Sequence, residues 1–173
     1  MLLKNLRHRA RLHWNLLNLL WRFDVIAEPA VTVKYWRSIR IGRHCTLQTA
    51  AYLYGSRSGC ELVLGDHVVV SNACMLLAEG GIAISSFTHL GPQVVITTQY
   101  GDSSGEMCTE NPVRKLAPVR IGAGCWIGSG AVIMPGTVLG DRCIVSPNAV
   151  VFGSWGDDTA LAGNPARRLR GAA

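Results

Sequence analysis

Aliphatic residues recur every six positions along much of the chain. A period of six fits neither the 3.6-residue repeat of a helix nor the two-residue alternation of a simple strand. It predicts a short strand with two inward side chains and then a turn, repeated many times. The clearest run is Ile121, Ile127, Ile133, Leu139, Val145 and Val151, and the same phase occurs earlier at Leu64, Val70 and Leu76, at Ile84, Leu90 and Ile96, and more weakly at Ile41, Leu47 and Leu53.

The residues beside these positions indicate a closed coil. The next residue is often glycine, and the fifth position of each hexad is mostly small: Cys125, Ala131, Thr137, Cys143 and Ala149, with Trp155 as the exception. Three hexads close one triangular turn, and stacked turns bury a continuous core. The sequence therefore predicts an all-β chain, a parallel β-helix of hexapeptide repeats with about five coils.

Two segments interrupt the repeat, and the ends of the chain have their own composition. A short insertion covers 54–61, and a longer protruding loop rich in Gly, Ser, Asp and Pro covers 99–119. Long excursions from a rigid scaffold often carry function. We expect an N-terminal helical cap over 1–30, the β-helix over 31–163, and a basic C-terminal tail over 164–173.

The N-terminal segment has two interpretations. Leu6, Trp14, Leu17 and Trp21 would share one side of a helix that also carries arginines. Such a helix either caps the first coil or lies on an anionic membrane surface. Its apolar run is short and lacks a small-residue cleavage site, which argues against a signal peptide. We expect a cytoplasmic protein, with peripheral contact at the inner face of the membrane as the second possibility.

Charge and composition narrow the functional classes. The 173 residues form one domain by length, with a net charge of +6 and no run of 18 apolar residues. The Lys and Arg residues cluster near the two ends, and the middle has no basic stripe interleaved with aromatic residues, so nucleic acid is not an expected partner. The six cysteines form no CxxC pair, so no metal site is expected.

The run "VRIGAGCWIGSGAVIMPGTVLGDRCIVSPNAVV", followed by "LAGNPARRLR", resembles the hexapeptide-repeat acyltransferases. The resemblance covers roughly residues 60–170 and is nearest to the maltose and galactoside acetyltransferases and the polysaccharide O-acetyltransferases. It implies a left-handed coil, a homotrimer with active sites between subunits, and acetyl-CoA as donor. The implied acceptor is a sugar hydroxyl or amine, in surface polysaccharide or glycoconjugate assembly. The alternative is a catalytically impaired scaffold subunit that binds CoA or a glycan.

The resemblance also implies residues for both substrates. Ser129 would lie along the pantetheine arm, and the basic residues Arg167 and Arg170 would lie near the CoA phosphates, a role that suits a guanidinium group. Without CoA, these arginines are an exposed basic terminus. The implied donor residues are Ser129, Gly163, Asn164, Arg167 and Arg170, and the implied acceptor residues, which could equally be solvated coil-edge groups, are Ser71, Asn72 and Glu79.

The stretch "ITTQYGD" departs from the family. Polysaccharide-type relatives place a histidine base here, with an aspartate beside it, whereas this chain has Gln99 and Thr98. A glutamine amide cannot accept a proton, but it can orient an acceptor or donate to an oxyanion. We therefore expect Gln99 in the catalytic site, with His89 or Asp102 as a distant base. The alternatives are a surface role for His89 and a turn-capping role for Asp102.

Overall fold

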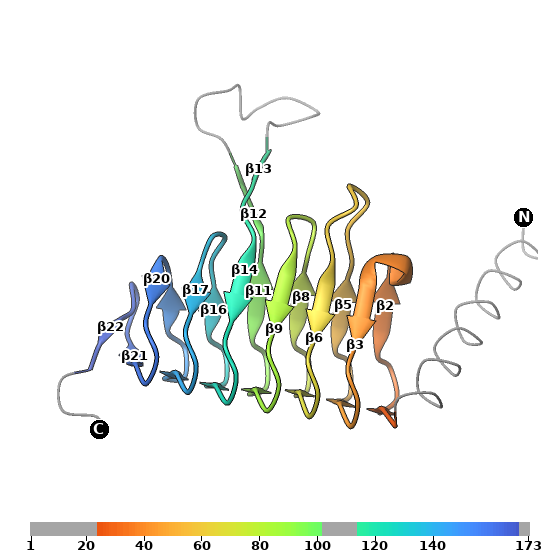
Figure 1. Ribbon diagram of the computed structural model, residues 1–173, viewed down its shortest axis with the longest axis horizontal. Coiled ribbons are helices and arrows are strands. Elements are labelled where there is room, and N and C mark those ends of the chain that lie inside the picture. Colours follow the sequence, from red (N-terminus) through yellow and green to blue (C-terminus); the bar gives the residue numbers. More distant parts are fainter. Residues whose placement is uncertain (1–23, 102–113, 170–173) are drawn as a thin grey trace, which may run out of the picture.

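The computed structural model of the protein describes residues 24–101 and 114–169. Three parallel sheets run along one solenoid, with β1 at one end and β21 at the other (Figure 1). Sheet 1 contains, in spatial order, β1 (Ile26–Ala27), β4 (Thr46–Leu47), β7 (Val69–Val70), β10 (His89–Leu90), β15 (Trp126–Ile127), β18 (Ile144–Val145), β21 (Ala160–Ala162) and the antiparallel β22 (Arg167–Arg168).

Sheets 2 and 3 complete the triangle. Sheet 2 contains β2 (Thr32–Lys34), β5 (Tyr52–Tyr54), β8 (Met75–Leu77), β11 (Val95–Thr97), β16 (Val132–Ile133) and β19 (Val150–Val151). Sheet 3 contains β3 (Ile39–Ile41), β6 (Leu62–Leu64), β9 (Ile82–Ile84), β14 (Val119–Ile121), β17 (Val138–Leu139) and β20 (Ser154–Trp155). A short 3-10 helix, η1 (Trp36–Ser38), links β2 to β3.

One strand from each sheet makes one turn of the solenoid. Turn 1 is β1–β3, turn 2 is β4–β6, turn 3 is β7–β9, turn 4 is β10, β11 and β14, turn 5 is β15–β17, and turn 6 is β18–β20. The described residues therefore form six turns, and the prediction of about five was too low. The early hexads are weaker in sequence because η1 and the insertion at 54–61 separate their strands, yet they form turns 1 and 2.

The register confirms the hexapeptide pattern. Along sheet 1, Leu47, Val70, Leu90, Ile127 and Val145 stand directly beside one another in successive turns. Of the fifteen aliphatic positions predicted to face inward, fourteen are at most 2% exposed, and the other, Ile41, is half-buried. The sequence phase therefore located the core correctly.

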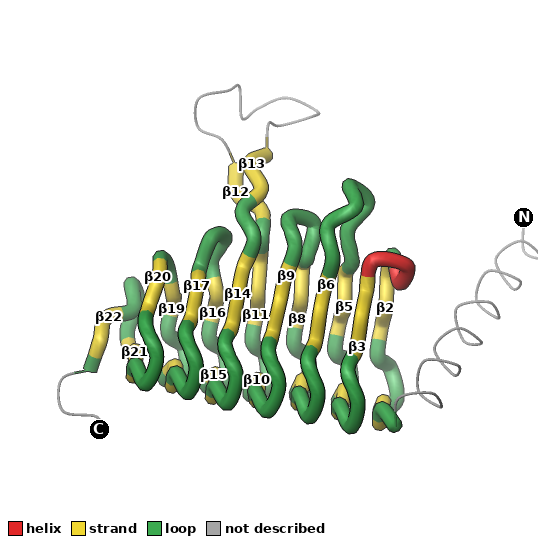
Figure 2. The backbone as a smooth tube through the Cα atoms, in the orientation of Figure 1, coloured by secondary structure: helices red, strands yellow, loops and turns green. Residues whose placement is uncertain are grey.

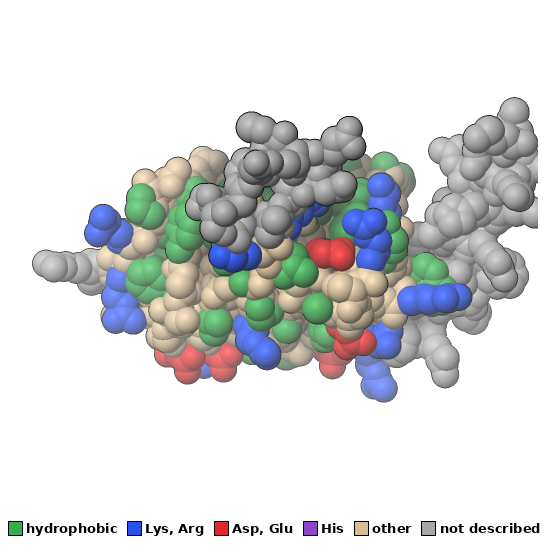
Figure 3. All heavy atoms as spheres, turned by 90° about the horizontal axis from the view of Figure 1, so that it is seen from above, with side chains coloured by type: hydrophobic (Ala, Val, Ile, Leu, Met, Phe, Trp, Pro, Cys, Tyr) green, Lys and Arg blue, Asp and Glu red, His purple; other side chains and the backbone are tan. Residues whose placement is uncertain are grey.

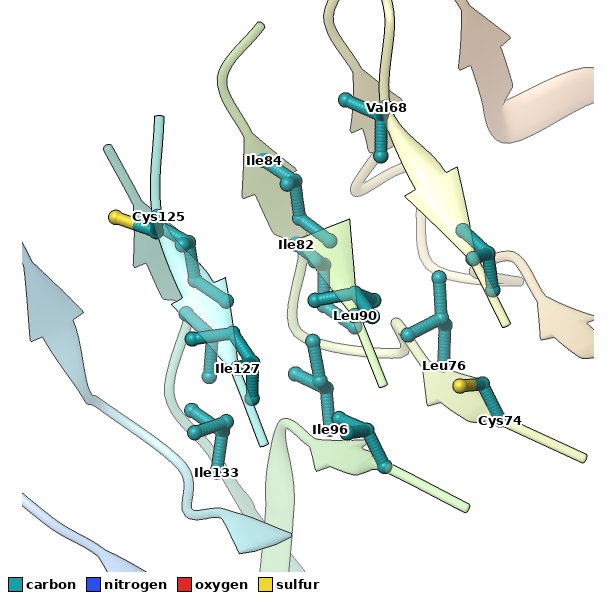
Figure 4. Close-up of a cluster of buried hydrophobic side chains, with 14 of the residues drawn as sticks. Val68, Cys74, Leu76, Ile82, Ile84, Leu90, Ile96, Cys125, Ile127 and Ile133 are labelled. Atoms are coloured by element: carbon teal, nitrogen blue, oxygen red, sulfur yellow. The ribbon is translucent and has the colours of Figure 1, made fainter. Parts of the chain in front are cut away.

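The core is a continuous column of aliphatic side chains between the three sheets (Figure 4). Cys45, Cys74, Cys125 and Cys143 are free, buried thiols within it. Burial raises the pKa of the Cys125 thiol to about 11, and its Sγ donates to the Gly140 carbonyl at 3.1 Å. These cysteines act as small apolar side chains, and each thiol donates to a backbone carbonyl of an adjacent turn.

One hairpin projects from the solenoid between β11 and β14. It is formed by β12 (Gln99–Gly101) and β13 (Arg114–Leu116), which pair antiparallel (Figures 1 and 2). The hairpin is the base of the loop predicted over 99–119, and residues 102–113 lie outside the described residues. Figure 3 looks down on this edge and shows basic and acidic side chains close together beside the hairpin.

The two ends differ from the predicted boundaries. β1 belongs to turn 1, so residues 26–30 continue the solenoid instead of the helical cap predicted over 1–30. The remainder of that predicted helix, residues 1–23, lies outside the described residues. At the other end, β22 pairs with β21 within the range 164–173 that was predicted as a tail.

Candidate functional site at the base of the hairpin

Thr98 fixes the point where the chain leaves the solenoid. Its Oγ1 donates to the Leu77 carbonyl and accepts from the Gly80 N–H, both at 2.8 Å. The Ala117 N–H donates to the Thr98 carbonyl at 2.9 Å, which closes the base of the hairpin. Thr98 is fully buried. Thr98, which stands where the family resemblance expects an aspartate, therefore anchors the hairpin in this chain.

A pocket of about 450 Å³ lies beneath the hairpin. Its size falls within the range of about 300–1,000 Å³ that is common for small-molecule sites. The pocket is lined by four outward side chains of sheet 2 (Tyr52, Tyr54, Met75, Leu77), three hairpin residues (Gln99, Arg114, Leu116) and two loop residues (Arg57, Glu79). The neighbouring pairs Tyr52–Met75 and Tyr54–Leu77 form its floor, because adjacent strands bring them into register.

The insertion at 54–61 is tied to the turn that carries Glu79. Ser56 Oγ and Ser58 Oγ donate to the Glu79 carbonyl at 3.0 and 3.2 Å. The Arg57 N–H donates to Glu79 Oε2 at 3.4 Å. These contacts bring Arg57 and the half-buried Glu79 together, and both residues line the pocket.

The first turn supports this insertion from the other side. Ser38 Oγ accepts from the Ser56 N–H at 2.8 Å. A Cβ on Gly55 would lie 2.6 Å from the backbone carbonyl oxygen of Tyr35, so this close approach requires glycine. The Tyr35 ring packs edge-on against Tyr54 with 4.9 Å between centroids. Burial and a hydrogen bond with Tyr35 raise the pKa of Tyr54, so its phenol stays protonated at neutral pH.

The structure brings together two of the predicted site residues and separates others. Gln99 and Glu79 line the same pocket. His89 does not line it: its ring stacks on Trp126 with 4.5 Å between centroids, and its Nε2 lies 3.4 Å from Ser71 Oγ. Ser71 is buried and Asn72 is exposed, and neither lines this pocket. Asp102 lies outside the described residues.

The predicted donor residues lie on later turns. Ser129 follows β15 and is exposed, and its backbone nitrogen would be only 2.8 Å from a Cβ on Gly91 in the preceding turn. Gly163 and Asn164 are exposed between β21 and β22, and Arg167 is exposed in β22. The neighbouring Arg168 donates to Thr159 Oγ1 at 2.8 Å. Arg170 lies outside the described residues.

Sequence reasoning named Gln99 and Glu79 but none of the other seven pocket residues, which include Tyr52, Tyr54, Arg57 and Arg114. The sequence feature that could have identified them is the break in the hexad pattern at 54–61, together with the longer excursion that follows Gln99. Both breaks fall at the same corner of the solenoid, after strands of sheet 2. The insertion leaves turn 2 and the hairpin leaves turn 4, so the corner of turn 3 that carries Glu79 lies between them.

Neither a cluster of metal ligands nor a membrane-spanning helix occurs in the part of the chain that the structure describes. Across 24–101 and 114–169, no three His, Cys, Asp or Glu side chains come together as a metal ion would require. In the same ranges, no helix has the length and hydropathy needed to cross a membrane.

The C-terminal turns match a known family, and the whole solenoid has known structural counterparts. Residues 118–153 match the family model described as bacterial transferase hexapeptide (six repeats). A variant of the N-acyltransferase AntD from Bacillus cereus, solved in complex with dTDP and Coenzyme A, has a similar fold. Its TM-score is 0.74, at 20% identity over 84% of this chain and 80% of that chain.

Two curated relatives share part of the sequence. WcaF of Escherichia coli, which is assigned to colanic acid biosynthesis as an acetyltransferase, is 28% identical over 110 residues, covering 64% of this chain and 58% of WcaF. Nodulation protein L of Rhizobium meliloti is 32% identical over 109 residues, covering 63% of this chain and 59% of that protein. The similarity therefore spans less than two thirds of the length of either relative.

Proposed function

Because the chain belongs to the hexapeptide-repeat acyltransferases, we propose that it transfers an acetyl group from acetyl-CoA to a sugar hydroxyl or amine. The observation that carries the proposal is the continuity of the solenoid. The turns that match the transferase family model are stacked directly on those that form the pocket. The similarity to WcaF supports a role in surface polysaccharide or glycoconjugate biosynthesis.

The donor would bind along the later turns. In this proposal Ser129 contacts the pantetheine arm, the backbone at Gly163 and Asn164 borders the CoA site, and Arg167 and Arg170 bind its phosphates. Arg167 is exposed, and its guanidinium group has no hydrogen-bond partner among the described residues, which is consistent with a group free to bind phosphate. Guanidinium groups pair well with phosphate oxygens because their donors form a planar fork.

The chemistry requires a group that takes a proton from the acceptor. When an acceptor oxygen bonds to the acetyl carbon, the C–S bond breaks, CoA leaves as thiolate, and the hydroxyl proton must go to a base. The amide of Gln99 cannot accept that proton. Of the nine residues that line the pocket, only Glu79 has a carboxylate. We assign Glu79 as the base and Gln99 as the residue that orients the acceptor or donates to the oxyanion.

This assignment takes the place of His89, one of the two distant bases expected from the sequence. His89 stacks on Trp126 outside the pocket lining, so it would need an acceptor bound elsewhere. Asp102 keeps its place as an alternative base, since it follows the described strand β12 directly. Positioning the acceptor beside the thioester can itself lower the barrier by several kcal/mol.

Acetyl transfer is the direct test of this function. The full chain should release CoA from acetyl-CoA faster in the presence of a sugar acceptor than with water alone, and mass spectrometry should detect a product heavier by one acetyl group. A panel of monosaccharides, nucleotide sugars and polysaccharide fragments would identify the acceptor. CoA binding without transfer to any member would instead support the scaffold alternative, for which the missing histidine at Gln99 is the motivating observation.

Replacing Arg167 with alanine should weaken CoA binding about tenfold or more, because a charged hydrogen bond to phosphate is lost. Isothermal titration calorimetry measures this directly. If the contact is to the 3′-phosphate, dephospho-CoA should lose much less affinity on the same substitution. Arg120→Ala, which removes an exposed arginine from sheet 3, is the matched control for overall charge. Equal losses of CoA affinity in both variants would show that Arg167 makes no specific contact with CoA.

The same family relationship supports a left-handed coil and a homotrimer, with the active site completed by a neighbouring subunit. Analytical ultracentrifugation of the full chain tests the assembly, and a stable monomer would argue against a shared site. The basic segment 1–23 carries the further proposal of contact with an anionic membrane at the cytoplasmic face.

A further inference from the structure

The pocket beneath the hairpin holds more positive than negative charge. Two of its lining residues are arginines, Arg57 and Arg114, and one is an acid, Glu79. The arginines come from two separate insertions, the segment 54–61 and the hairpin strand β13. A neutral sugar needs no such pair, because hydroxyl groups are bound adequately by amides, hydroxyls and single carboxylates.

Arg57 is held at the pocket by several contacts. Its backbone N–H donates to Glu79 Oε2, and the serines on both sides of it donate to the Glu79 carbonyl. Its guanidinium carbon lies 5.7 Å from the centre of the Tyr35 ring, a distance typical of a cation–π contact. This contact leaves the N–H donors at the edge of the guanidinium group available to a ligand.

Arg114 stands on the hairpin side of the same pocket. It pairs with Gly101 at the start of β13, and its side chain is exposed. The anchoring of Thr98 fixes the strand that carries it. The two arginines are exposed, and the segments that carry them are tied to the solenoid by hydrogen bonds. Neither guanidinium charge is neutralised by an ion pair within the described residues.

The floor between them suits a sugar ring. The Tyr52 and Tyr54 rings are stacked with 6.3 Å between centroids, and Met75 and Leu77 lie beside them in the next strand. A largely apolar floor with a few convergent polar groups is the usual composition of a small-molecule site. The donor residues proposed above lie on turn 5 and later, whereas this floor lies on turns 2 and 3, so the arginines are not needed for CoA.

We propose that the acceptor is an anionic sugar, and that Arg57 and Arg114 bind its negatively charged group. This inference rests on the acetyl transfer proposed above and specifies its substrate class. The charged group is a carboxylate, as in a hexuronic acid, or a phosphate, as in a sugar phosphate. The apolar face of the sugar packs on Tyr52 and Tyr54, and the hydroxyl to be acetylated lies toward Glu79 and Gln99.

Matched acceptors test the inference with the full chain. Glucuronate-containing oligosaccharides are compared with their carboxyl-reduced neutral forms, and sugar 1-phosphates with the free sugars. We expect KM for one anionic series to be at least about tenfold lower than for its neutral partner, as a charge-assisted hydrogen bond allows. Whichever anionic series is preferred identifies the charged group as carboxylate or phosphate.

Substitution of the two arginines tests whether they cause the preference for anionic acceptors. Arg57→Gln and Arg114→Gln should each raise KM for the preferred anionic acceptor about tenfold, leave KM for acetyl-CoA unchanged, and leave the neutral acceptor nearly unaffected. Arg40→Gln, which removes an exposed arginine paired with Glu61 on sheet 3, should change none of these values. Circular dichroism spectra would verify that each variant is folded.

Three outcomes would overturn the inference. Equal use of neutral and anionic acceptors would do so while leaving the acetyltransferase function intact. A rise in KM for acetyl-CoA in place of the acceptor would reassign the arginines to the donor. If no acceptor of either charge is acetylated and calorimetry detects no binding of the anionic sugars, both the function and its substrate class fail.

Discussion

Replacing Glu79 with glutamine should lower kcat for acetyl transfer by about 10²–10⁴-fold, the usual contribution of a general base. The amide keeps an oxygen that can accept the Arg57 N–H, so the local hydrogen bond seen at 3.4 Å can persist. What is lost is the ability to take the acceptor's proton. Steady-state kinetics with saturating acetyl-CoA would separate this loss in kcat from any change in KM.

A nearby acid provides the control for Glu79→Gln. Glu61→Gln removes a carboxylate from the insertion 54–61, which contacts Glu79, but the Glu61 side chain pairs with Arg40 at 3.2 Å and does not line the pocket. Its kcat should stay within about twofold of the wild type, as expected for a surface residue away from the site. Unchanged kcat in Glu79→Gln would move the base to Asp102 or His89, which Asp102→Asn and His89→Gln would then distinguish.

Gln99 occupies the position that family resemblance gives to a histidine, and its role follows from its proximity to Glu79. If Glu79 is the base, Gln99→Ala should reduce kcat less than Glu79→Gln, because it removes only an orienting hydrogen bond. The Gln99→His variant distinguishes two interpretations of the site. A large gain would indicate a decayed histidine site that is still correctly built, whereas a loss would indicate that glutamine belongs to a different mechanism.

The core could be predicted from sequence because the rule that places it is local. An inward position such as Leu90 or Ile127 needs an aliphatic side chain whatever lies elsewhere in the chain, and both are fully buried. The coil number was underestimated because a local rule loses its phase at insertions. Leu53 and Leu62 are both fully buried in turn 2, but the excursion between them breaks the spacing of six.

The pocket could be predicted only in part, because it depends on contacts between distant segments. Family resemblance supplied Gln99 and Glu79. It did not supply Arg57 or Arg114, whose meeting depends on where two insertions leave the solenoid and how each is anchored. Each insertion is anchored by individual side-chain hydrogen bonds, such as those from Thr98 Oγ1 to the Leu77 carbonyl and from Ser56 Oγ to the Glu79 carbonyl. No periodicity in the sequence encodes them.

Replacing Gly122 with alanine should lower the free energy of unfolding by about 2–3 kcal/mol, as overpacking a tight interior does. Gly122 follows the inward Ile121 at a corner where successive turns touch. A Cβ there would lie 2.4 Å from both the carbonyl carbon and the oxygen of Gly140 in the next turn. These are backbone atoms, and the Gly122 N–H donates to Leu139 O at 2.9 Å, so neither turn can move without losing a bond between turns.

Gly156→Ala isolates this steric effect, because the same corner two turns later is open. No atom lies within 4 Å of a Cβ at Gly156, and neither glycine has a positive φ that would itself disfavour alanine. Gly156→Ala should therefore change stability by no more than about 0.5 kcal/mol, or stabilise slightly through the unfolded chain. Urea denaturation followed by circular dichroism would compare the two. Similar stability for both variants would mean that the turns are packed less tightly at Gly122 than the 2.4 Å approach requires.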